Sequence, residues 1–366
     1  MKIALLTYST KPRGSVIHTL ELAEALHHLG HSITVFALDK DGTGFDYPLS
    51  CKVQLIPAKP APSEIDQLIY QRIQEFVSHL EQLQHSYDCY HAQDCLAANA
   101  LLTLHKQGKI PHFVRTVHHI EDYSSLYLQQ CQDRSIREAS LCLCVSDRVQ
   151  SELQEHYQID APRVINGVNL KRFSPNGSSL KFDGSPIYLT IGGIEPRKNS
   201  IRLLQAFSQV LEQFPNARLI IAGGATLFDY QSYRDEFFTI AKSLNLENAI
   251  ILTGVLSDAE LPALYRSADA FVFPSVKEGW GLVILEAIAS GLPVITSNQT
   301  PFTEFLSDRQ AILVDPYSVN AIAQSMCSMF QSADSPRLQS QSILSQYSWE
   351  TSAKQHIHHY QTLLYA

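Results

Sequence analysis

The sequence lacks any run of apolar residues long enough to cross a bilayer, which takes about 18 or more. The apolar stretch at residues 3–8 is short and leads into a Pro-Gly turn without a small-residue cleavage site, so it predicts a first β-strand rather than a signal peptide. The helix expected at residues 64–84 has a polar face of Gln and Glu with a single Arg, which is not typical of a basic membrane-surface helix. We therefore expect a cytoplasmic protein with no transmembrane segment, and peripheral contact with a membrane stays open.

Basic residues are not in excess. The chain has 28 Lys and Arg against 36 Asp and Glu, which gives a formal net charge of −8 at pH 7. A nucleic-acid-binding protein needs a strongly basic face, so the charge balance argues against nucleic acid as the main partner.

The seven cysteines show no paired C-x-x-C spacing. Cys142 and Cys144 alternate within residues 141–145, which is more typical of one face of a buried strand than of a metal site. The odd number and scattered positions of the cysteines indicate a reducing compartment. No Asp-rich metal-binding element is apparent either, so we expect neither a bound metal nor a resident cofactor.

Both halves of the chain alternate short β-branched runs with amphipathic helices, the pattern of parallel α/β sheets. In the first half, a strand at 3–8, a helix ended by Gly30 and a strand at 32–38 predict a βαβ unit. Further strands are expected at 112–117 and 141–145.

Residues 170–186 are rich in Ser, Gly and Pro and lack periodicity, so they predict a linker between two domains. The 366 residues are enough for two hydrophobic cores of ordinary size. We expect a first domain at 1–172 and a second at 183–348.

The most informative segment is residues 278–286, where Glu278 and Glu286 bracket a Gly-rich loop that becomes a helix. A strand predicted at 270–274 ends just before the first carboxylate. Such a strand, turn and helix start binds phosphates, because unpaired backbone N–H groups and the helix dipole favour anions. Carboxylates would repel a phosphate, but they accept hydrogen bonds from hydroxyls on either side of it. The pattern therefore points to a nucleotide sugar, which has a sugar at each end of a diphosphate.

The spacing of the two glutamates is weak evidence by itself. A helical segment of this length spans about 12 Å at ~1.5 Å per residue, similar to the separation of ribose and hexose in a nucleotide sugar. On spacing alone, an exposed Glu278 in a loop and a capping or surface Glu286 are the simpler interpretation. The residues around them favour a functional role.

The string at 278–296 resembles the signature of the family 4 retaining glycosyltransferases (glycosyl transferases group 1), which have the GT-B architecture. Other segments match the same family in the same order; they are residues 12–18, 116–119, 145–146, 164–169, 191–199, 219–224 and 252–275. The resemblance implies an α/β fold of two doubly wound Rossmann-like domains facing across a cleft. A C-terminal helix at 349–366 would cross back to the first, acceptor-side domain, and the second domain would bind the nucleotide sugar.

The resemblance also implies roles in the second domain. Glu286 would accept hydrogen bonds from the ribose, whereas Glu278 would accept them from the donor sugar and stabilise positive charge developing there. Lys198 would neutralise the diphosphate as the glycosidic bond breaks; an ordinary solvated Lys at a helix start would face an unfavourable dipole. Further donor contacts are expected at the start of the helix, from Gly279, Trp280, Gly281 and Leu282.

One position departs from the family pattern. An Arg often follows the first glycine of the motif at 191–199, but this chain has Gly193. Arg197 is a plausible substitute for that second cation, or it points away from its neighbour Lys198. The sequence leaves both alternatives open.

In the first domain, His118 follows a predicted strand and matches the active-site histidine of the family. The match implies a contact with a donor-sugar hydroxyl. A single histidine is more often structural or solvated, and the adjacent His119 leaves the register open by one residue. We prefer His118.

Four loop residues are expected to approach the ligands. Gly14 and Ser15 stand where the family has a glycine pair, and they would let the loop approach the donor phosphate or the acceptor. Gly254 and Val255 follow a predicted strand, and the backbone of such a loop would contact the nucleobase. An ordinary tight turn is the alternative for Gly14 and Ser15.

We therefore expect a glycosyltransferase, a hexosyltransferase, that retains anomeric configuration and needs no metal, with His118, Lys198 and Glu278 as catalytic residues. It would move a sugar from a nucleotide-sugar donor to an acceptor hydroxyl on a glycan, glycolipid or small molecule. The alternatives are a GT-B sugar-nucleotide epimerase and a non-catalytic nucleotide-sugar-binding protein. The first βα turn lacks G-x-G-x-x-G, which disfavours a nicotinamide-dependent dehydrogenase. Donor base, donor sugar, acceptor, linkage and oligomeric state stay open.

Overall fold

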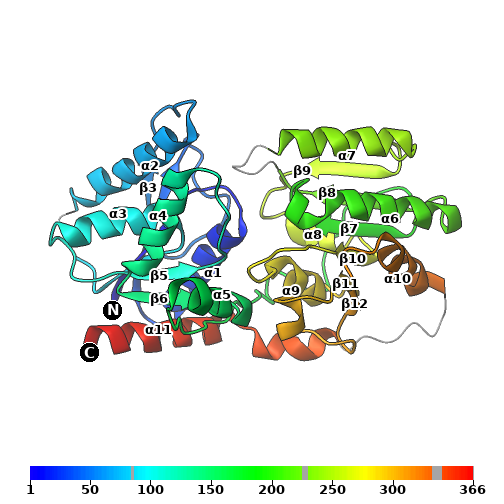
Figure 1. The fold of residues 1–366 in the computed structure, drawn as a ribbon. Helices are drawn as coiled ribbons and strands as arrows, with labels where there is room; N and C mark the ends of the chain where they lie inside the picture. The colour runs from blue at the N-terminus through cyan, green and yellow to red at the C-terminus, as the bar shows by residue number, and fades with distance from the viewer. Residues whose placement is uncertain (84–85, 225–229, 332–339, 366) are drawn as a thin grey trace. The chain divides into compact units, whose positions relative to one another are not determined.

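The structure, a computed structural model, describes residues 1–83, 86–224, 230–331 and 340–365. The chain forms two compact units, residues 1–167 with 347–366 and residues 168–346. Each unit has a parallel six-stranded sheet with helices on its faces (Figure 1), so the expected doubly wound α/β fold is confirmed. Residues 332–339 of the expected second domain and residue 366 of the expected C-terminal helix lie outside the described residues.

The first unit has the strand order β3-β2-β1-β4-β5-β6, that of a Rossmann fold. The strand that begins at Lys2 pairs in parallel with a strand on each side, so that Ile3 lies opposite Ile33 on one side and Cys89 on the other. Its residues after Lys2 are therefore buried. The strands are β1 (Lys2–Thr7), β2 (Ser32–Asp39), β3 (Lys52–Pro57), β4 (Cys89–Ala92), β5 (Val114–Val117) and β6 (Leu141–Cys144). The helices are α1 (Gly14–His28), α2 (Ile65–Leu80), α3 (Cys95–Lys106), α4 (Leu126–Arg137), α5 (Asp147–Tyr157) and α11 (Trp349–Tyr365).

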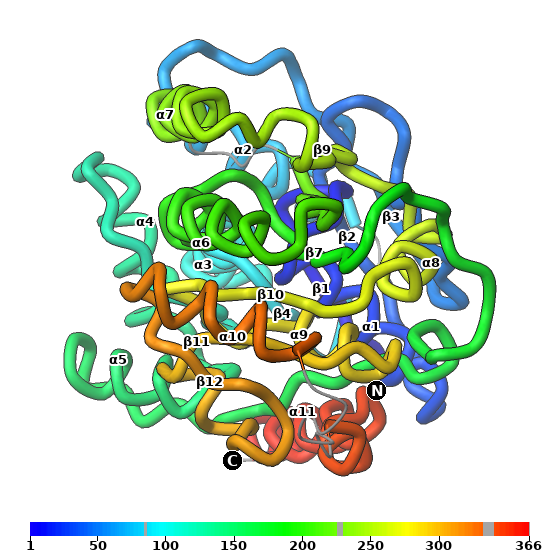
Figure 2. Tube along the Cα trace, turned by 90° about the vertical axis from the view of Figure 1, so that its right-hand side faces the viewer, coloured from blue at the N-terminus to red at the C-terminus, as the bar shows by residue number. Residues whose placement is uncertain are grey.

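The C-terminal helix α11 packs beside α1 in the first unit (Figure 2). At its start, the Ser348 hydroxyl accepts the N–H of Thr351 at 3.1 Å. Gly167 allows the close approach, because a Cβ there would lie 2.3 Å from the backbone nitrogen of Trp349. These contacts make α11 part of the first core although residues 168–346 intervene in the sequence.

The second unit has the order β12-β11-β10-β7-β8-β9, again that of a Rossmann fold. Its strands are β7 (Ile187–Ile191), β8 (Arg218–Ala222), β9 (Ile250–Gly254), β10 (Ala270–Phe273), β11 (Val294–Ser297) and β12 (Ile312–Val314). Its helices are the 3₁₀ turns η1 (Pro196–Lys198), η2 (Phe302–Glu304) and η3 (Ser340–Gln346) and the α-helices α6 (Ser200–Gln213), α7 (Gln231–Ser243), α8 (Leu261–Tyr265), α9 (Leu282–Ala289) and α10 (Val319–Gln331). The order reverses between β7 and β10, where doubly wound sheets bind ligands at the carboxyl ends of their strands.

Two elements show how well local signals set the boundaries. The helix expected at 64–84 ends at Leu80, where its apolar periodicity ends. Before α8, the N–H of Ser257 bonds Glu260 Oε2 at 3.1 Å and the N–H of Glu260 bonds the Ser257 hydroxyl at 3.3 Å. This reciprocal pair is a capping box, a signal that needs no distant contact.

Candidate functional site

The loops after β7 and β10 are joined at the carboxyl edge of the second sheet. The carbonyl of Arg197 accepts the N–H of Val276 at 2.9 Å and the hydroxyl of Ser275 at 2.6 Å. The buried Asn199 donates from Nδ2 to the carbonyl of Pro274 at 3.0 Å. These bonds hold the two loops together and fix the side chains they carry.

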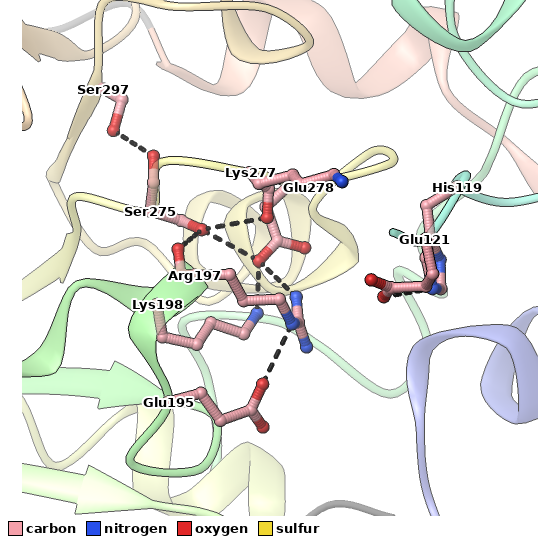
Figure 3. Close-up of polar contacts among 9 residues, drawn as sticks. All are labelled: His119, Glu121, Glu195, Arg197, Lys198, Ser275, Lys277, Glu278 and Ser297. Atoms are coloured by element: carbon pink, nitrogen blue, oxygen red, sulfur yellow. Dashed lines mark hydrogen bonds and ion pairs between the residues drawn. The ribbon is translucent and has the colours of Figure 1, made fainter. Parts of the chain in front are cut away.

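Glu278 is the centre of an ion-pair cluster in these loops (Figure 3). Its Oε1 accepts from Lys198 Nζ at 2.6 Å, from Arg197 Nη1 at 2.8 Å and from the Ser275 hydroxyl at 3.0 Å. Arg197 also donates from Nε to Glu195 Oε2 at 2.9 Å. The Glu278 side chain is only 10% exposed, which rules out an exposed loop carboxylate. Arg197 points into the cluster together with Lys198, so the alternative in which it points away is wrong.

The charges in this cluster set the pKa of its carboxylate. Burial raises the pKa of Glu278, but Lys198 and Arg197 outweigh burial and lower this pKa from 4.5 to about 2. Burial also lowers the pKa of Lys198, and Glu278 opposes that shift. With Glu195, the cluster holds two carboxylates and two cations and is neutral overall.

Two glycines after β7 shape the space around the cations. Gly192 has φ +142°, and a Cβ there would lie 3.0 Å from Cε of Lys198. A Cβ at Gly193 would lie 2.6 Å from the carbonyl oxygen of Gly224 and 2.9 Å from Glu195 Oε1. The first glycine therefore lets the lysine stem pass, and the second leaves no room for a side chain.

Gly254 and Val255 lie at the end of β9, next to the loop after β8. The carbonyl of Gly254 accepts the N–H of Gly223 at 2.9 Å. Val255 is exposed, and its Cγ2 would lie 2.6 Å from a Cβ at Gly224. The glycine ends of β7, β8 and β9 therefore adjoin at one edge of the sheet.

The turn into α9 is held by packing. Gly281 has φ +104°, and a Cβ there would lie 2.9 Å from the ring of Phe302, so only glycine fits. Trp280 is buried and stacks on Phe305 with 4.6 Å between ring centroids. The indole therefore anchors the turn between Gly279 and Leu282.

Glu286 projects from α9 into a buried position. Its Oε2 accepts a hydrogen bond from the Tyr265 hydroxyl at 2.7 Å. Burial raises the pKa of Glu286, whereas the bond from Tyr265 opposes that shift. The pKa values of Glu278 and Glu286 are thus shifted in opposite directions, as expected for carboxylates with different tasks.

In the first unit, His118 follows β5 and is half-buried. Its Nε2 lies 2.9 Å from Gln93 Oε1, and its ring centroid lies 4.7 Å from that of His18. Burial, and then His18, keep the pKa of His118 well below 6.5, so the ring is neutral at pH 7. His119 is exposed and pairs with Glu121 at 3.0 Å (Figure 3). Of the two histidines, His118 has the fixed, desolvated position.

Gly14 and Ser15 open helix α1. Gly14 is exposed, and nothing lies within 4 Å of a Cβ placed there. The Ser15 carbonyl accepts from the Thr19 hydroxyl at 2.7 Å inside the helix. A side chain at position 14 would therefore meet no other residue, so packing does not explain the glycine there.

Sequence reasoning missed three polar residues of the site. Ser275 lies two residues after the end of β10, so the rule that ligands meet the carboxyl ends of strands could have found it. Glu195 lies in the matched motif but was given no role. Tyr265 could not be found in this way, because its contact with Glu286 joins α8 to α9 and leaves no local pattern.

Within the described ranges, no helix is both long enough and apolar enough to cross a membrane. In the same ranges, no three or more His, Cys, Asp or Glu side chains are grouped to hold a metal ion. None of the seven cysteines forms a disulfide, and Cys142 and Cys144 are buried in β6.

Two family models match consecutive parts of the chain. The one described as Glycosyltransferase Family 4 matches residues 12–172, and the one described as Glycosyl transferases group 1 matches residues 175–343. Among curated proteins, the O-antigen chain mannosyltransferase B of Escherichia coli is 31% identical over 255 residues, which is 65% of this chain and 64% of that protein. The alignment thus spans slightly less than two thirds of that relative.

Solved structures share the fold of the whole chain. The sucrose-phosphate synthase of Thermosynechococcus elongatus matches with a TM-score of 0.82 and 22% identity, over 99% of this chain and 98% of that one. HepE of Anabaena, in complex with UDP-glucose, matches with a TM-score of 0.77 and 19% identity, over 99% and 100%. These likenesses establish the GT-B fold.

Proposed function

This chain belongs to the glycosyltransferase family that both models describe, and we propose that it is a hexosyltransferase that moves a sugar from a nucleotide-sugar donor to an acceptor hydroxyl. The observation that carries the proposal is the buried cluster in which Lys198 and Arg197 bond one oxygen of Glu278. A diphosphate leaving group needs preorganised cations in a site with little water. The mannosyltransferase relative and the UDP-glucose in HepE support a hexose carried on a nucleotide.

In the proposed reaction, the bond from the anomeric carbon to the diphosphate oxygen breaks and the acceptor oxygen bonds that carbon. The acceptor proton passes to the leaving phosphate. Negative charge grows on the diphosphate, where Lys198 and the N–H groups at the start of α9 stabilise it. Glu278 stabilises the positive charge on the sugar ring. No side chain is assigned as a nucleophile. The acceptor oxygen therefore attacks the anomeric carbon from the face on which the diphosphate departs, and the configuration is retained.

The remaining residues are proposed to position the substrates. Tyr265 bonds Oε2 of Glu286, and the other carboxylate oxygen accepts from the ribose hydroxyls. His118 contacts a donor-sugar hydroxyl as a neutral ring. The backbone at Gly254 and Val255 contacts the nucleobase.

Gly14 and Ser15 are proposed to border the donor phosphate or the acceptor. The reaction needs no metal, since side-chain cations and a helix start supply the positive charge. It takes place in the cytoplasm, which suits seven cysteines that form no disulfide. Turnover that persists in EDTA supports the metal-free reaction, and loss of turnover that a divalent cation restores overturns it.

The first experiment is a screen of UDP-, GDP-, ADP- and dTDP-hexoses for thermal stabilisation, because a bound donor raises the melting temperature by mass action. The donor that stabilises the protein is then followed by NMR with and without acceptor alcohols. Transfer with a retained anomeric signal supports the proposal. Conversion of the donor without an acceptor indicates an epimerase, and stabilisation without turnover indicates a non-catalytic binder.

The second experiment compares three variants. Lys198→Ala and Glu286→Ala are expected to lower turnover by about 100- to 1,000-fold, the usual effect of removing one preorganised charge or donor. Lys242→Ala changes an exposed lysine of the same unit and is expected to keep full activity. Melting temperatures show whether each variant is folded. Near-normal turnover in both site variants would remove the assignment.

A further inference from the structure

Position 193 is closed to the arginine that the family motif often has there. A Cβ on Gly193 would meet a backbone carbonyl, that of Gly224, at 2.6 Å. It would also meet the Glu195 carboxylate at 2.9 Å, well inside van der Waals contact. The Glu195 carboxylate thus lies in the space that a side chain at position 193 would need. A second cation therefore has to come from another position in the chain.

Arg197 reaches the cluster from η1, one residue before Lys198. Its Nη1 and the Nζ of Lys198 lie 2.8 and 2.6 Å from the same oxygen, Oε1 of Glu278. Two cations thus converge on one anionic point, which is the arrangement that a phosphate oxygen requires. The Arg197 side chain is 35% exposed, so an entering anion can reach it.

Glu195 fixes Arg197 from the opposite side. Its side chain is only 4% exposed and bonds Nε of Arg197 at 2.9 Å. A buried carboxylate is costly without a charged partner, so this bond is expected to persist when the surroundings change. The planar guanidinium can keep that bond at Nε while Nη1 exchanges its partner.

In the ligand-free protein, both cations already bond Glu278. A diphosphate therefore has to compete with this carboxylate for Arg197 and Lys198. If Arg197 were absent, Lys198 alone would face two carboxylates and the cluster would repel a diphosphate.

We propose that Arg197, held by Glu195, is the second cation of the diphosphate site, and that donor binding exchanges its bond to Glu278 for a phosphate oxygen. This rests on the proposed function, since the anion is taken to be the donor diphosphate. Glu278, released by the exchange, becomes available to the donor-sugar hydroxyls. Glu195 is a positioning residue, because its carboxylate bonds the guanidinium of Arg197 and holds it in place.

Calorimetric titration tests this exchange without relying on turnover. UDP, GDP and ADP are titrated into the wild-type protein, and then UMP, GMP and AMP. The leaving oxygen belongs to the terminal phosphate, so Arg197→Gln is expected to weaken the diphosphate by about 10- to 100-fold and the matching monophosphate by about threefold or less. Arg197→Lys keeps the charge but replaces the planar fork with a single ammonium, which presents no two donors in fixed directions to Glu195 and phosphate, so an intermediate loss is expected. Arg309→Gln, at an exposed arginine of the same unit, is expected to bind like wild type.

The role of Glu195 is tested by a double-mutant cycle. Glu195→Gln alone is expected to weaken the diphosphate by about 3- to 30-fold, with no further loss when it is added to Arg197→Gln. A merely structural role would lower affinity in both backgrounds and would overturn the assignment.

The outcomes separate the two proposals. If the wild-type protein binds neither these three diphosphates nor dTDP, the proposed function fails. If it binds one of them and the arginine variants bind equally well, the function stands and the exchange is wrong. Should Arg197→Gln not fold, Arg197→Lys with a normal melting temperature decides the question.

Discussion

Lowering the pH from 7 to 5 is expected to destabilise the first unit and to leave the second nearly unchanged. All 15 histidines lie outside residues 168–346 and therefore belong to the first unit. Four of them, His18, His91, His118 and His356, form a connected cluster with ring centroids 4.7 to 5.8 Å apart along α1 and α11 and at the ends of β4 and β5. Histidine is the side chain whose ordinary pKa lies in this pH range, so the effect should be confined to one unit.

The hydrogen bonds show why protonation in this cluster is costly. His18 Nδ1 lies 2.5 Å from Asn166 Oδ1, and His356 Nδ1 lies 2.8 Å from the carbonyl of Ser352. Because carbonyl oxygens only accept, both Nδ1 atoms donate and each Nε2 carries the lone pair. Neither Nε2 has a hydrogen-bond partner among the described residues, and both are buried. Protonation would therefore place a charged N–H where no acceptor meets it.

The magnitude follows from the pKa values. Burial lowers the pKa of His18 from 6.5 to about 4 and that of His356 from 6.5 to about 3. The unfolded chain takes up these protons below about pH 6.5 and the folded chain does not, so stability falls from pH 6.5 until each folded pKa is passed. Between pH 7 and 5 each ring costs about 2 kcal/mol, or about 4 kcal/mol for the two. His91 and His118, with pKa values also lowered chiefly by burial, act in the same direction.

The second unit has a different pH window. The folded pKa of Glu278 is lowered from 4.5 to about 2, so the stability that its ion pairs contribute is lost only as pH falls from about 4.5 toward 2. At pH 5 this carboxylate is still ionised in both the folded and the unfolded chain. Burial raises the pKa of Glu286, so protonation of that group favours the folded second unit as the pH falls. The second unit should therefore lose no stability between pH 7 and 5.

The two tryptophans report the units separately, because Trp349 lies in the first and Trp280 in the second. Urea unfolding is followed by fluorescence at pH 7 and pH 5 in Trp280→Phe, which leaves Trp349, and in Trp349→Phe, which leaves Trp280. With a typical urea dependence of about 2 kcal/mol per molar, the midpoint at Trp349 should fall by about 2 M. The midpoint at Trp280 should change little.

A control variant removes one of the titrating rings. His356→Phe keeps a buried aromatic ring without a titrating nitrogen, so it should lessen the pH-dependent loss at Trp349 by about 2 kcal/mol. Equal shifts at both tryptophans, or no shift at Trp349, would refute the reasoning.

Two further predictions concern single contacts. Gly167→Ala places a Cβ 2.3 Å from the backbone nitrogen of Trp349, which cannot yield unless α11 moves, so the first unit should lose about 1–3 kcal/mol of stability in urea; unchanged stability would contradict the close packing of this helix. Tyr265→Phe removes the hydrogen bond to Glu286 and should raise the pKa of that carboxyl further and weaken nucleoside diphosphate binding by about 3- to 10-fold; calorimetry that finds equal affinity would count against a ribose contact at Glu286.

The local parts of this fold could be predicted from the sequence. The alternation of β-branched runs and amphipathic helices in the second half forms strands such as β7 (Ile187–Ile191), and Ser257 and Glu260 form a capping box before α8. The apolar periodicity of a helix or strand and the residues that cap a helix depend on neighbours within a few positions. A single sequence is therefore enough to recognise them. The glycine turn at Gly281 belongs to the same class, because its positive φ excludes most other residues.

The partners of the site residues could not be predicted in this way. Arg197 and Lys198 lie about 80 positions from Glu278 in sequence, and their contacts depend on β7 pairing with β10. The same holds for Tyr265, whose hydroxyl reaches Glu286 only because α8 and α9 pack together. The sequence pointed to both glutamates, but it could not show that each already has a partner in the ligand-free protein.

Because Glu278 already bonds both cations in the ligand-free protein, removing its charge should change diphosphate affinity and turnover in opposite directions. Glu278→Gln keeps the shape of the side chain but removes the charge that binds Lys198 at 2.6 Å and Arg197 at 2.8 Å. Hydrogen bonds to charged groups contribute about 1.5–3 kcal/mol, so without this competitor UDP or GDP should bind about tenfold more tightly.

A free nucleoside diphosphate has no sugar for Glu278 to contact, so calorimetry measures the competition alone. Sugar transfer, in contrast, needs the carboxylate beside the ring and should slow by about 100-fold or more. Glu247→Gln, at an exposed position of the same unit, should alter neither quantity. If Glu278→Gln bound the diphosphate more weakly, the carboxylate would assist the anion instead of competing with it, and the exchange of partners at Arg197 would be excluded.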